Sequence, residues 1–243
     1  MRALTTTNLD YLAARLHGRR SRMAEGARLD TLCRLRGIPD SRAQSAKEFQ
    51  RLLVEELVWE VSEFLPLLDR PGARLVEWML MRLQVKAPAS PVTWEEFENK
   101  VGMVVLAPVR QLPAKPFFME AVLDQRYYRE LLARAAALTE DVQRLVRHEA
   151  EEFQRALFVR GQANYGLTPA VLAQFAVLDE MPAKVTERYR LANRAMRRSP
   201  TGLGTVVGYV MLRRIEIANL TTISEGIRLE LSEEIIRRRV THV

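Results

Sequence analysis

Apolar side chains recur along this chain at steps of three, four and seven residues, which is the period of helices that bury one face. The first stretch runs from about residue 8 to 25, and another runs from about Ser45 to Leu65. We expect further helices to begin near Arg70, Thr93, residue 117, Thr139, Thr168, Pro182, residue 205 and Ser232. The sequence therefore predicts an all-α, multi-helical fold.

The clearest helix start is Thr93-Trp94-Glu95-Glu96, a capping box that opens a helix expected to reach about Leu106. The run Val104-Val105-Leu106 is the one stretch that suggests a strand. Residues 107–116 contain three prolines and resemble a linker. We therefore predict N-terminal helical module(s) over 1–107 and C-terminal helical modules over 108–243.

Two segments are weakly similar, residues 148–172 and residues 214–236. Each contains an acidic helix, an apolar stripe, a glycine, and then a leucine with a Ser or Thr that opens a short helix. Such a repeat indicates two to three stacked similar modules that form a funnel-like or irregular bundle. Chance is an equally good explanation, because helical proteins share these periodicities.

The net charge is +7, and arginines gather near the N-terminus and again from Arg188 to Arg198. A basic face can meet nucleic acid, anionic lipid headgroups or an acidic protein surface, or it can simply be solvated. The chain has no apolar run of transmembrane length, and its first residues lack the features of a signal peptide. We expect a cytoplasmic protein, with the single Cys33 reduced.

The sequence gives no sign of catalysis. His148 and Glu152 lie one helical turn apart, but a zinc-protease pattern would need a second histidine. The glycines from Gly202 to Gly208 do not have dinucleotide-loop spacing, so they more simply allow two helices to approach closely. We predict that the chain is not an enzyme and has no catalytic residue, cofactor, metal or small-molecule substrate.

Four carboxylates are expected on one face of the helix around residues 45–65, opposite Phe49, Leu53 and Leu57. They are Glu55, Glu56, Glu60 and Glu63. A solvated face is the default interpretation, and a contact for a basic partner is the alternative.

The segment from Tyr11 to Met23 resembles the N-terminal signature of the AC39 family, the C-type subunit of prokaryotic V-type/A-type rotary ATPases, which has a eukaryotic counterpart. The signature has an aromatic residue, a small-Arg pair and a Ser-Arg pair before a long apolar side chain. The matching residues are Tyr11, Ala14, Arg15, Ser21, Arg22 and Met23. Asp124-Gln-Arg-Tyr-Tyr resembles an acidic-aromatic element of the same family.

A more specific match lies in the segment from Glu216 to Gly226, which is similar to the closing motif of that family. Glu216, Asn219 and Gly226 keep the spacing of that motif. This chain is shorter than is usual in the family, so the resemblance is to a shortened and divergent member.

The resemblance implies a non-catalytic central-stalk subunit, part of the rotor of a rotary H⁺ or Na⁺ ATPase. Its partners would be the membrane proteolipid ring and the central-shaft subunits, and it would lie peripherally on the cytoplasmic face of the membrane. The competing hypothesis is a basic helical module that binds nucleic acid.

Arg15, Arg19 and Arg22 line one side of the first predicted helix. One interpretation is an internal arginine network that pairs with acids such as Glu216 or Asp124. The alternatives are contact with the polar loops of a membrane ring or with anionic headgroups, and contact with nucleic acid. Asn219 is expected to be a buried, hydrogen-bonded amide.

Overall fold

The computed structural model describes residues 6–34, 46–84, 93–180, 188–198 and 202–240. Over these residues the secondary structure is entirely helical, with twelve α-helices and one short 3-10 helix. No strand forms in them, so the apolar residues Val104 to Leu106 are not a strand. The predicted all-α fold is confirmed.

The chain divides into two compact units. Unit 1 combines residues 1–73 with residues 187–243, and unit 2 comprises residues 74–186. The helix α4 (Arg70–Gln84) contributes its first residues to unit 1 and the rest to unit 2. The module boundary predicted at residues 107–108 lies inside unit 2 and stays a prediction.

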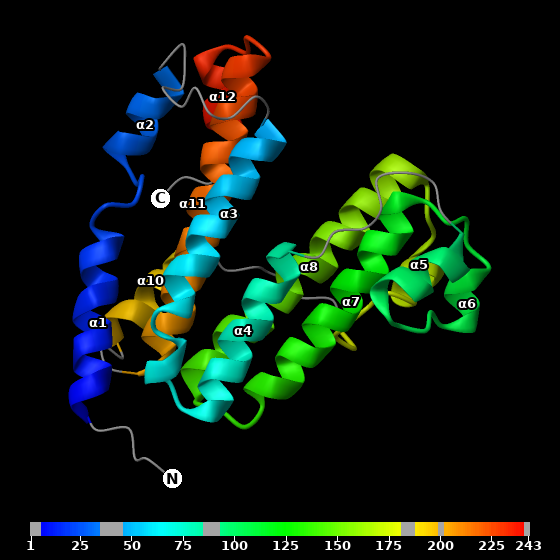
Figure 1. Cartoon of the computed structure of the whole chain (residues 1–243). Coiled ribbons are helices and arrows are strands. Elements are labelled where there is room, and N and C mark those ends of the chain that lie inside the picture. The colour runs from blue at the N-terminus through cyan, green and yellow to red at the C-terminus, as the bar shows by residue number, and fades with distance from the viewer. Residues whose placement is uncertain (1–5, 35–45, 85–92, 181–187, 199–201, 241–243) are drawn as a thin grey trace. The chain divides into compact units, whose positions relative to one another are not determined.

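Unit 1 is built around the long helix α11, which packs against α10, α3, α1 and α12. Its elements are α1 (Thr6–Arg20), α2 (Ala27–Arg34), α3 (Ala46–Ser62), the 3-10 helix η1 (Leu65–Leu67), α10 (Arg188–Arg198), α11 (Leu203–Arg228) and α12 (Glu233–Arg239). Figure 1 shows α2 and α12 at the same end of the unit, where they contact each other.

The first half of α11 is buried on all sides from Gly204 to Leu212. A helix that is apolar all round has to lie inside a core, and this one supplies the centre of unit 1. Gly208 makes the close approach of α10 possible, since a Cβ atom there would lie 2.7 Å from the carbonyl oxygen of Ala192. The prediction that small residues in this segment let two helices approach closely is confirmed at Gly208.

The N-terminal helix is shorter than predicted. α1 ends at Arg20, and α2 begins after Gly26, whose φ of 50° favours glycine. The chain between them turns through Ser21 to Met23, where backbone amides bond to carbonyls three or four residues earlier.

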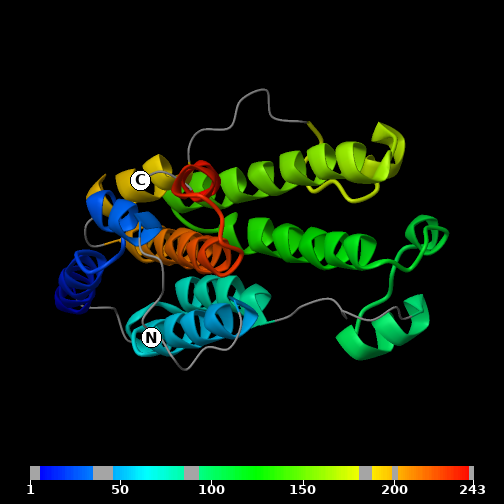
Figure 2. The ribbon, with the colours of Figure 1, turned by 90° about the horizontal axis from the view of Figure 1, so that it is seen from above.

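Unit 2 contains a pair of long helices with shorter helices around them. Besides most of α4, its elements are α5 (Trp94–Val101), α6 (Ala107–Arg110), α7 (Pro116–Ala135), α8 (Glu140–Tyr165) and α9 (Pro169–Ala173). Figure 2 shows α7 and α8 side by side along their length. Two buried glutamines hold the chain that follows α9: Gln125 donates to the carbonyl of Gln174, and Gln154 accepts from the amides of Val177 and Leu178.

The helix that opens at the Thr93 capping box stops earlier than predicted. Both hydrogen bonds of the capping box are present. Gly102, however, takes a left-handed φ of 64° and ends α5 at Val101. The proline-containing segment after it includes α6, and Val109 is buried in the core of unit 2.

The two segments of the predicted repeat end in the same way. Gly161 in α8 and Gly226 in α11 each lie under an aliphatic side chain of the following short helix, Leu172 and Ile236. A Cβ atom would come within 2.4 Å of Leu172 and 2.6 Å of Ile236. Both short helices also begin at a hydroxyl N-cap, Thr168 and Ser232. These contacts support the proposal of a repeat.

Candidate functional site: a buried ion-pair network

Two arginines of α1 lie one turn apart and bind carboxylates at the end of α3 and just after it. Arg15 Nη2 and Arg19 Nη2 each lie 2.6 Å from Oε2 of Glu63. Arg19 Nη1 also lies 3.1 Å from Oε1 of Glu60 and donates to the backbone carbonyl of that residue. Because guanidinium donors are directional, these bonds fix the rotation of α1 against α3.

The carboxylate of Glu60 is the point where α1, α3 and α11 meet. Its side chain is buried, with 8% of the residue exposed. Tyr209 of α11 donates its hydroxyl to Oε1 at 2.6 Å, and Arg213 Nε lies 3.2 Å from Oε2. Each oxygen of the Glu60 carboxylate therefore has a partner on α11, and Oε1 also pairs with Arg19.

The network continues along α11 and returns to the segment after α1. Arg213 forms a second ion pair with Glu216, and Glu216 Oε1 accepts a 2.6 Å hydrogen bond from the backbone amide of Ala24. Arg213 also lies 3.8 Å from the exposed Glu56. The ion pairs thus form a continuous path from Arg19 through Glu60 and Arg213 to Glu216.

Charge is balanced in this network. Its buried or half-buried members are three arginines and three carboxylates, Arg15, Arg19, Arg213, Glu60, Glu63 and Glu216. Burial by itself would lower the pKa of Arg213, but the carboxylates of Glu216 and Glu60 outweigh it and raise that pKa. Burial, together with the hydrogen bond to Glu60, raises the pKa of Tyr209. Arg213 is therefore held charged and Tyr209 neutral.

Three of the motif residues predicted from the sequence belong to this network: Arg15, Arg19 and Glu216. Tyr11 does not, since it is 58% exposed on α1. Arg22 is exposed in the turn after α1, and Ser21 donates its hydroxyl to the carbonyl of Gly18 at 2.8 Å.

The last two motif residues lie farther along α11. Asn219 is buried there, with 2% of its surface exposed. Gly226 makes the close contact with Ile236. The roles of all eight motif residues in partner contact stay a prediction.

The sequence predicts an internal arginine network but suggests other acids for it. The partners of Arg15 and Arg19 are Glu60 and Glu63, which the helical pattern places on a solvated face of the helix predicted around residues 45–65. Asp124 instead pairs with Arg82 of α4 at 2.6 Å, inside unit 2.

Tyr209 and Arg213 are absent from the sequence prediction. One signal could have found Arg213, because it directly follows the apolar run 203–212 and so lies at the end of a buried segment. A charged side chain in that position has to find partners as the helix packs.

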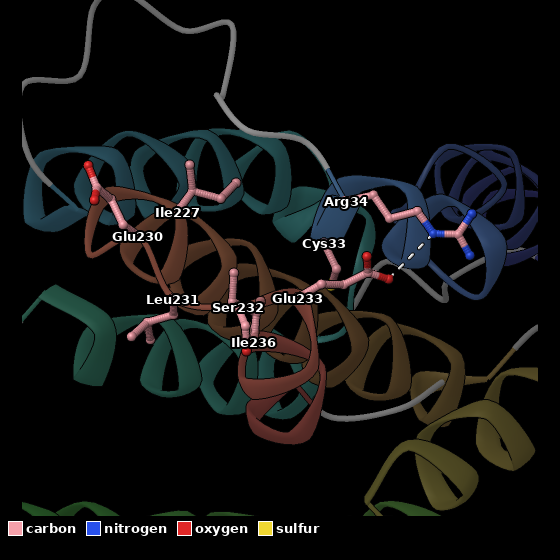
Figure 3. A pocket seen from close by; sticks show the side chains of 8 residues that line it. All are labelled: Cys33, Arg34, Ile227, Glu230, Leu231, Ser232, Glu233 and Ile236. Carbon is pink, nitrogen blue, oxygen red and sulfur yellow. Dashed lines mark ion pairs between the residues drawn. The ribbon is translucent and has the colours of Figure 1, made fainter.

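A separate hollow of about 610 Å³ lies in unit 1 between α2, the end of α11 and the start of α12. Figure 3 shows the side chains around it, with the ion pair between Arg34 and Glu233 at 3.5 Å. Cys33 lines its wall, and burial raises the pKa of this thiol, which disfavours the reactive thiolate. The hollow therefore does not resemble the site of a cysteine nucleophile.

Clustered metal ligands are absent from the part of the chain that the structure describes, where no three His, Cys, Asp or Glu side chains lie together as a metal would need. None of the helices described is long and apolar enough to cross a membrane.

Residues 178–239 match the family of the ATP synthase (C/AC39) subunit. The match confirms the family resemblance predicted from the closing motif. It covers about a quarter of the chain and includes α10, α11 and α12, hence Tyr209, Arg213 and Glu216 of the network. The N-terminal motif around Arg15 and Arg19 lies outside the matched residues. No curated protein and no solved structure showed significant similarity to the chain.

Proposed function

We propose that this chain, a member of the ATP synthase (C/AC39) subunit family, is a non-catalytic central-stalk subunit of a rotary V-type/A-type H⁺ or Na⁺ ATPase. In this role it links the ATP-driven shaft to the proteolipid ring and lies peripherally on the cytoplasmic face of the membrane. The observation that carries the proposal is the ion-pair network, since it joins the family-matched helix α11 to two other helices.

A protein that couples two rotating parts needs stiffness in torsion, because a soft element would store the rotation instead of passing it on. α11 has 26 residues, which corresponds to a length of about 39 Å. Apolar packing alone lets neighbouring helices slip by small amounts, whereas ion pairs and hydrogen bonds have preferred directions. The contacts of Glu60 with Arg19 and Arg213 therefore resist rotation of α1, α3 and α11 against one another.

The same network is costly to break. Removing one partner of a buried ion pair leaves an uncompensated charge, at a cost of about 3–5 kcal/mol. Arg213 is 11% exposed and Glu216 is 6% exposed, so solvent does little to compensate such a loss. The network therefore keeps α1, α3 and α11 in one relative arrangement while torque is transmitted.

Omission of the chain from a reconstituted complex tests the proposal. The nucleotide-binding, shaft and ring subunits from the same source would be assembled with and without it, and ATP hydrolysis and ion pumping into vesicles would be measured. We expect hydrolysis to continue without the chain while pumping is lost, and addition of the chain should restore pumping. Unchanged pumping in its absence would refute the proposal.

A variant tests the role of the network itself. Arg213→Ala is compared with Arg238→Ala, whose side chain is 77% exposed and pairs with Glu234 on the same helix. We expect complexes with Arg213→Ala to pump fewer ions for each ATP hydrolysed, and complexes with Arg238→Ala to match the unaltered chain. Equal pumping by the two would mean that the network plays no part in coupling.

A further inference from the structure

The helix α10 has one strongly basic face. Its exposed side chains include Arg190, Arg194, Arg197 and Arg198, and these positions fall within an arc of roughly 100° of the helix. The helix contains no acidic residue from Arg188 to Arg198. Positive charge is therefore concentrated here without carboxylates between the arginines.

Three of these side chains have no ion-pair partner among the described residues. They are Arg194, Arg197 and Arg198. Some exposed arginines on other helices pair with a neighbour, as Arg51 does with Glu55, and others, such as Arg126 and Arg160, have no ion pair among the described residues; α10 differs in placing three unpaired arginines on one face. The basic face of α10 thus keeps its charge for an external partner.

The opposite face of α10 fixes its orientation. Ala192, Ala195 and Met196 are buried, and the backbone of Ala192 lies against Gly208 of α11. A Cβ atom on Gly208 would also meet Met196 at 3.2 Å. Because this packing is tight, the three arginines point outward together and need no rearrangement to bind.

We propose that Arg194, Arg197 and Arg198 form a surface that binds the headgroups of anionic phospholipids. The inference rests on the proposed function, because that function brings the chain to a membrane face, and it adds a direct contact with lipid. A juxtamembrane arginine contributes about a fivefold gain in affinity for an anionic membrane. Three of them give roughly a 100-fold gain, which suits an auxiliary and reversible anchor.

The composition of this face favours lipid over a protein or a single-stranded nucleic acid. Specific protein interfaces have an apolar or aromatic centre within a polar rim. The centre of this face consists of arginines, and the one tyrosine of α10, Tyr189, is partly buried and bonded to Glu25. Single-stranded nucleic acid would need aromatic side chains for base stacking. A row of exposed arginines on a helix suits the phosphates of lipid headgroups, which form a layer of negative charge without fixed positions.

The test measures binding of the purified full chain to sedimenting vesicles. Vesicles of phosphatidylcholine with phosphatidylglycerol are compared with vesicles of phosphatidylcholine alone. The triple variant Arg194→Gln/Arg197→Gln/Arg198→Gln is compared with Arg144→Gln/Arg147→Gln/Arg160→Gln, which removes three exposed arginines from α8. Each variant lowers the net charge from +7 by three. Circular dichroism checks that both are folded.

We expect the unaltered chain to bind the anionic vesicles only, and added salt to weaken the binding. The α10 variant should bind roughly 100-fold more weakly, while the α8 variant stays close to the unaltered chain. A third variant with lysine at the three α10 positions should keep most of the binding, because lipid headgroups need charge rather than the arginine fork.

Equal binding by the α10 and α8 variants would overturn the proposal, since net charge alone would then explain the effect. Binding of duplex DNA that depends on the same arginines, without binding to anionic vesicles, would also overturn it and would assign the face to nucleic acid. The proposed coupling function is tested separately, because ion pumping by the reconstituted complex does not depend on these vesicle measurements.

Discussion

Arg213 Nε lies 3.2 Å from Oε2 of Glu60, and this ion pair joins the middle of α11 to α3 inside unit 1. Both side chains are 11% exposed. The pair is therefore shielded from water and depends on its other partners, Arg19, Tyr209 and Glu216, to balance the cost of burial. Substitutions in this ion pair should lower the free energy of unfolding far more than substitutions in the surface ion pairs.

Replacing Arg213 by alanine should destabilise the protein severely. The change leaves Glu216 with no arginine partner among the described residues and leaves Arg19 as the one described arginine paired with Glu60. We expect this loss to lower the free energy of unfolding by about 3–5 kcal/mol. Urea denaturation followed by circular dichroism measures it. The control is Arg238→Ala on the surface, which should change little; a similar loss in both variants would contradict the assignment of Arg213 as the centre of the network.

A methyl group at Gly226 should collide with Ile236. The added Cβ would lie 2.6 Å from Cγ1 of Ile236, so we expect Gly226→Ala to cost about 1–3 kcal/mol. Gly18→Ala is the matched control, because nothing lies within 4 Å of a Cβ atom there and alanine favours a helix. If the contact is the cause, adding Gly226→Ala to Ile236→Ala should cost less than Gly226→Ala does alone. Strict additivity in that double-mutant cycle would exclude it.

Replacing Glu230 by glycine should stabilise the protein. Its φ is 53°, and it lies at the end of α11, where the amide of Leu231 bonds to the carbonyl of Gly226 at 2.9 Å. A left-handed conformation strains a residue with a Cβ atom, so Glu230→Gly should raise the free energy of unfolding by up to about 1 kcal/mol. Thermal unfolding checks the gain. Glu230→Ala keeps the strain, and an equal gain in that variant would point to the loss of charge instead.

Tyr209 should make stability fall at alkaline pH. Its pKa in the folded protein is raised by burial and by Glu60, whereas in the unfolded chain it is near the ordinary value of about 10. Above about pH 10 the unfolded tyrosine loses its proton and the folded one keeps it. The contribution of Tyr209 to stability is therefore complete below about pH 10 and is lost as pH rises, by at most about 1.4 kcal/mol per pH unit.

The measurement is urea unfolding at a series of pH values from neutral to strongly alkaline. Tyr209→Phe removes the titrating hydroxyl, so its stability should fall less steeply in the alkaline range. It should also be less stable at neutral pH, because the buried carboxylate of Glu60 loses a donor. Parallel pH profiles for the variant and the unaltered chain would mean that Tyr209 does not cause the alkaline loss.

Helix starts are largely predictable from the sequence, because caps and turn residues act locally. Thr93, Thr168 and Ser232 each occupy the N-cap position that the pattern indicates. Helix ends are predicted less accurately. The helix at Thr93 is expected from its pattern to continue to Leu106, but Gly102 takes a left-handed φ and stops it at Val101.

The burial of Glu60 shows where sequence reasoning fails. The pattern places four carboxylates on one solvated face of the helix predicted around residues 45–65, yet Glu55 is exposed and Glu60 is buried. A periodic pattern treats every carboxylate as a surface group. Burial of a charge becomes favourable only when partners from distant segments reach it, and Arg19 and Arg213 lie 41 and 153 residues away along the chain.

The sequence by itself determined the helical class, most helix starts and the family motif around Glu216, because period, capping and motif spacing are properties of neighbouring residues. Only the tertiary structure decided that Arg19 and Glu216 belong to one network through Glu60 and Arg213, and that Tyr11 stays outside it. The physical reason is that an ion pair depends on the distance and direction between side chains after packing. In this protein the packing of α1 and α3 against α11 sets both.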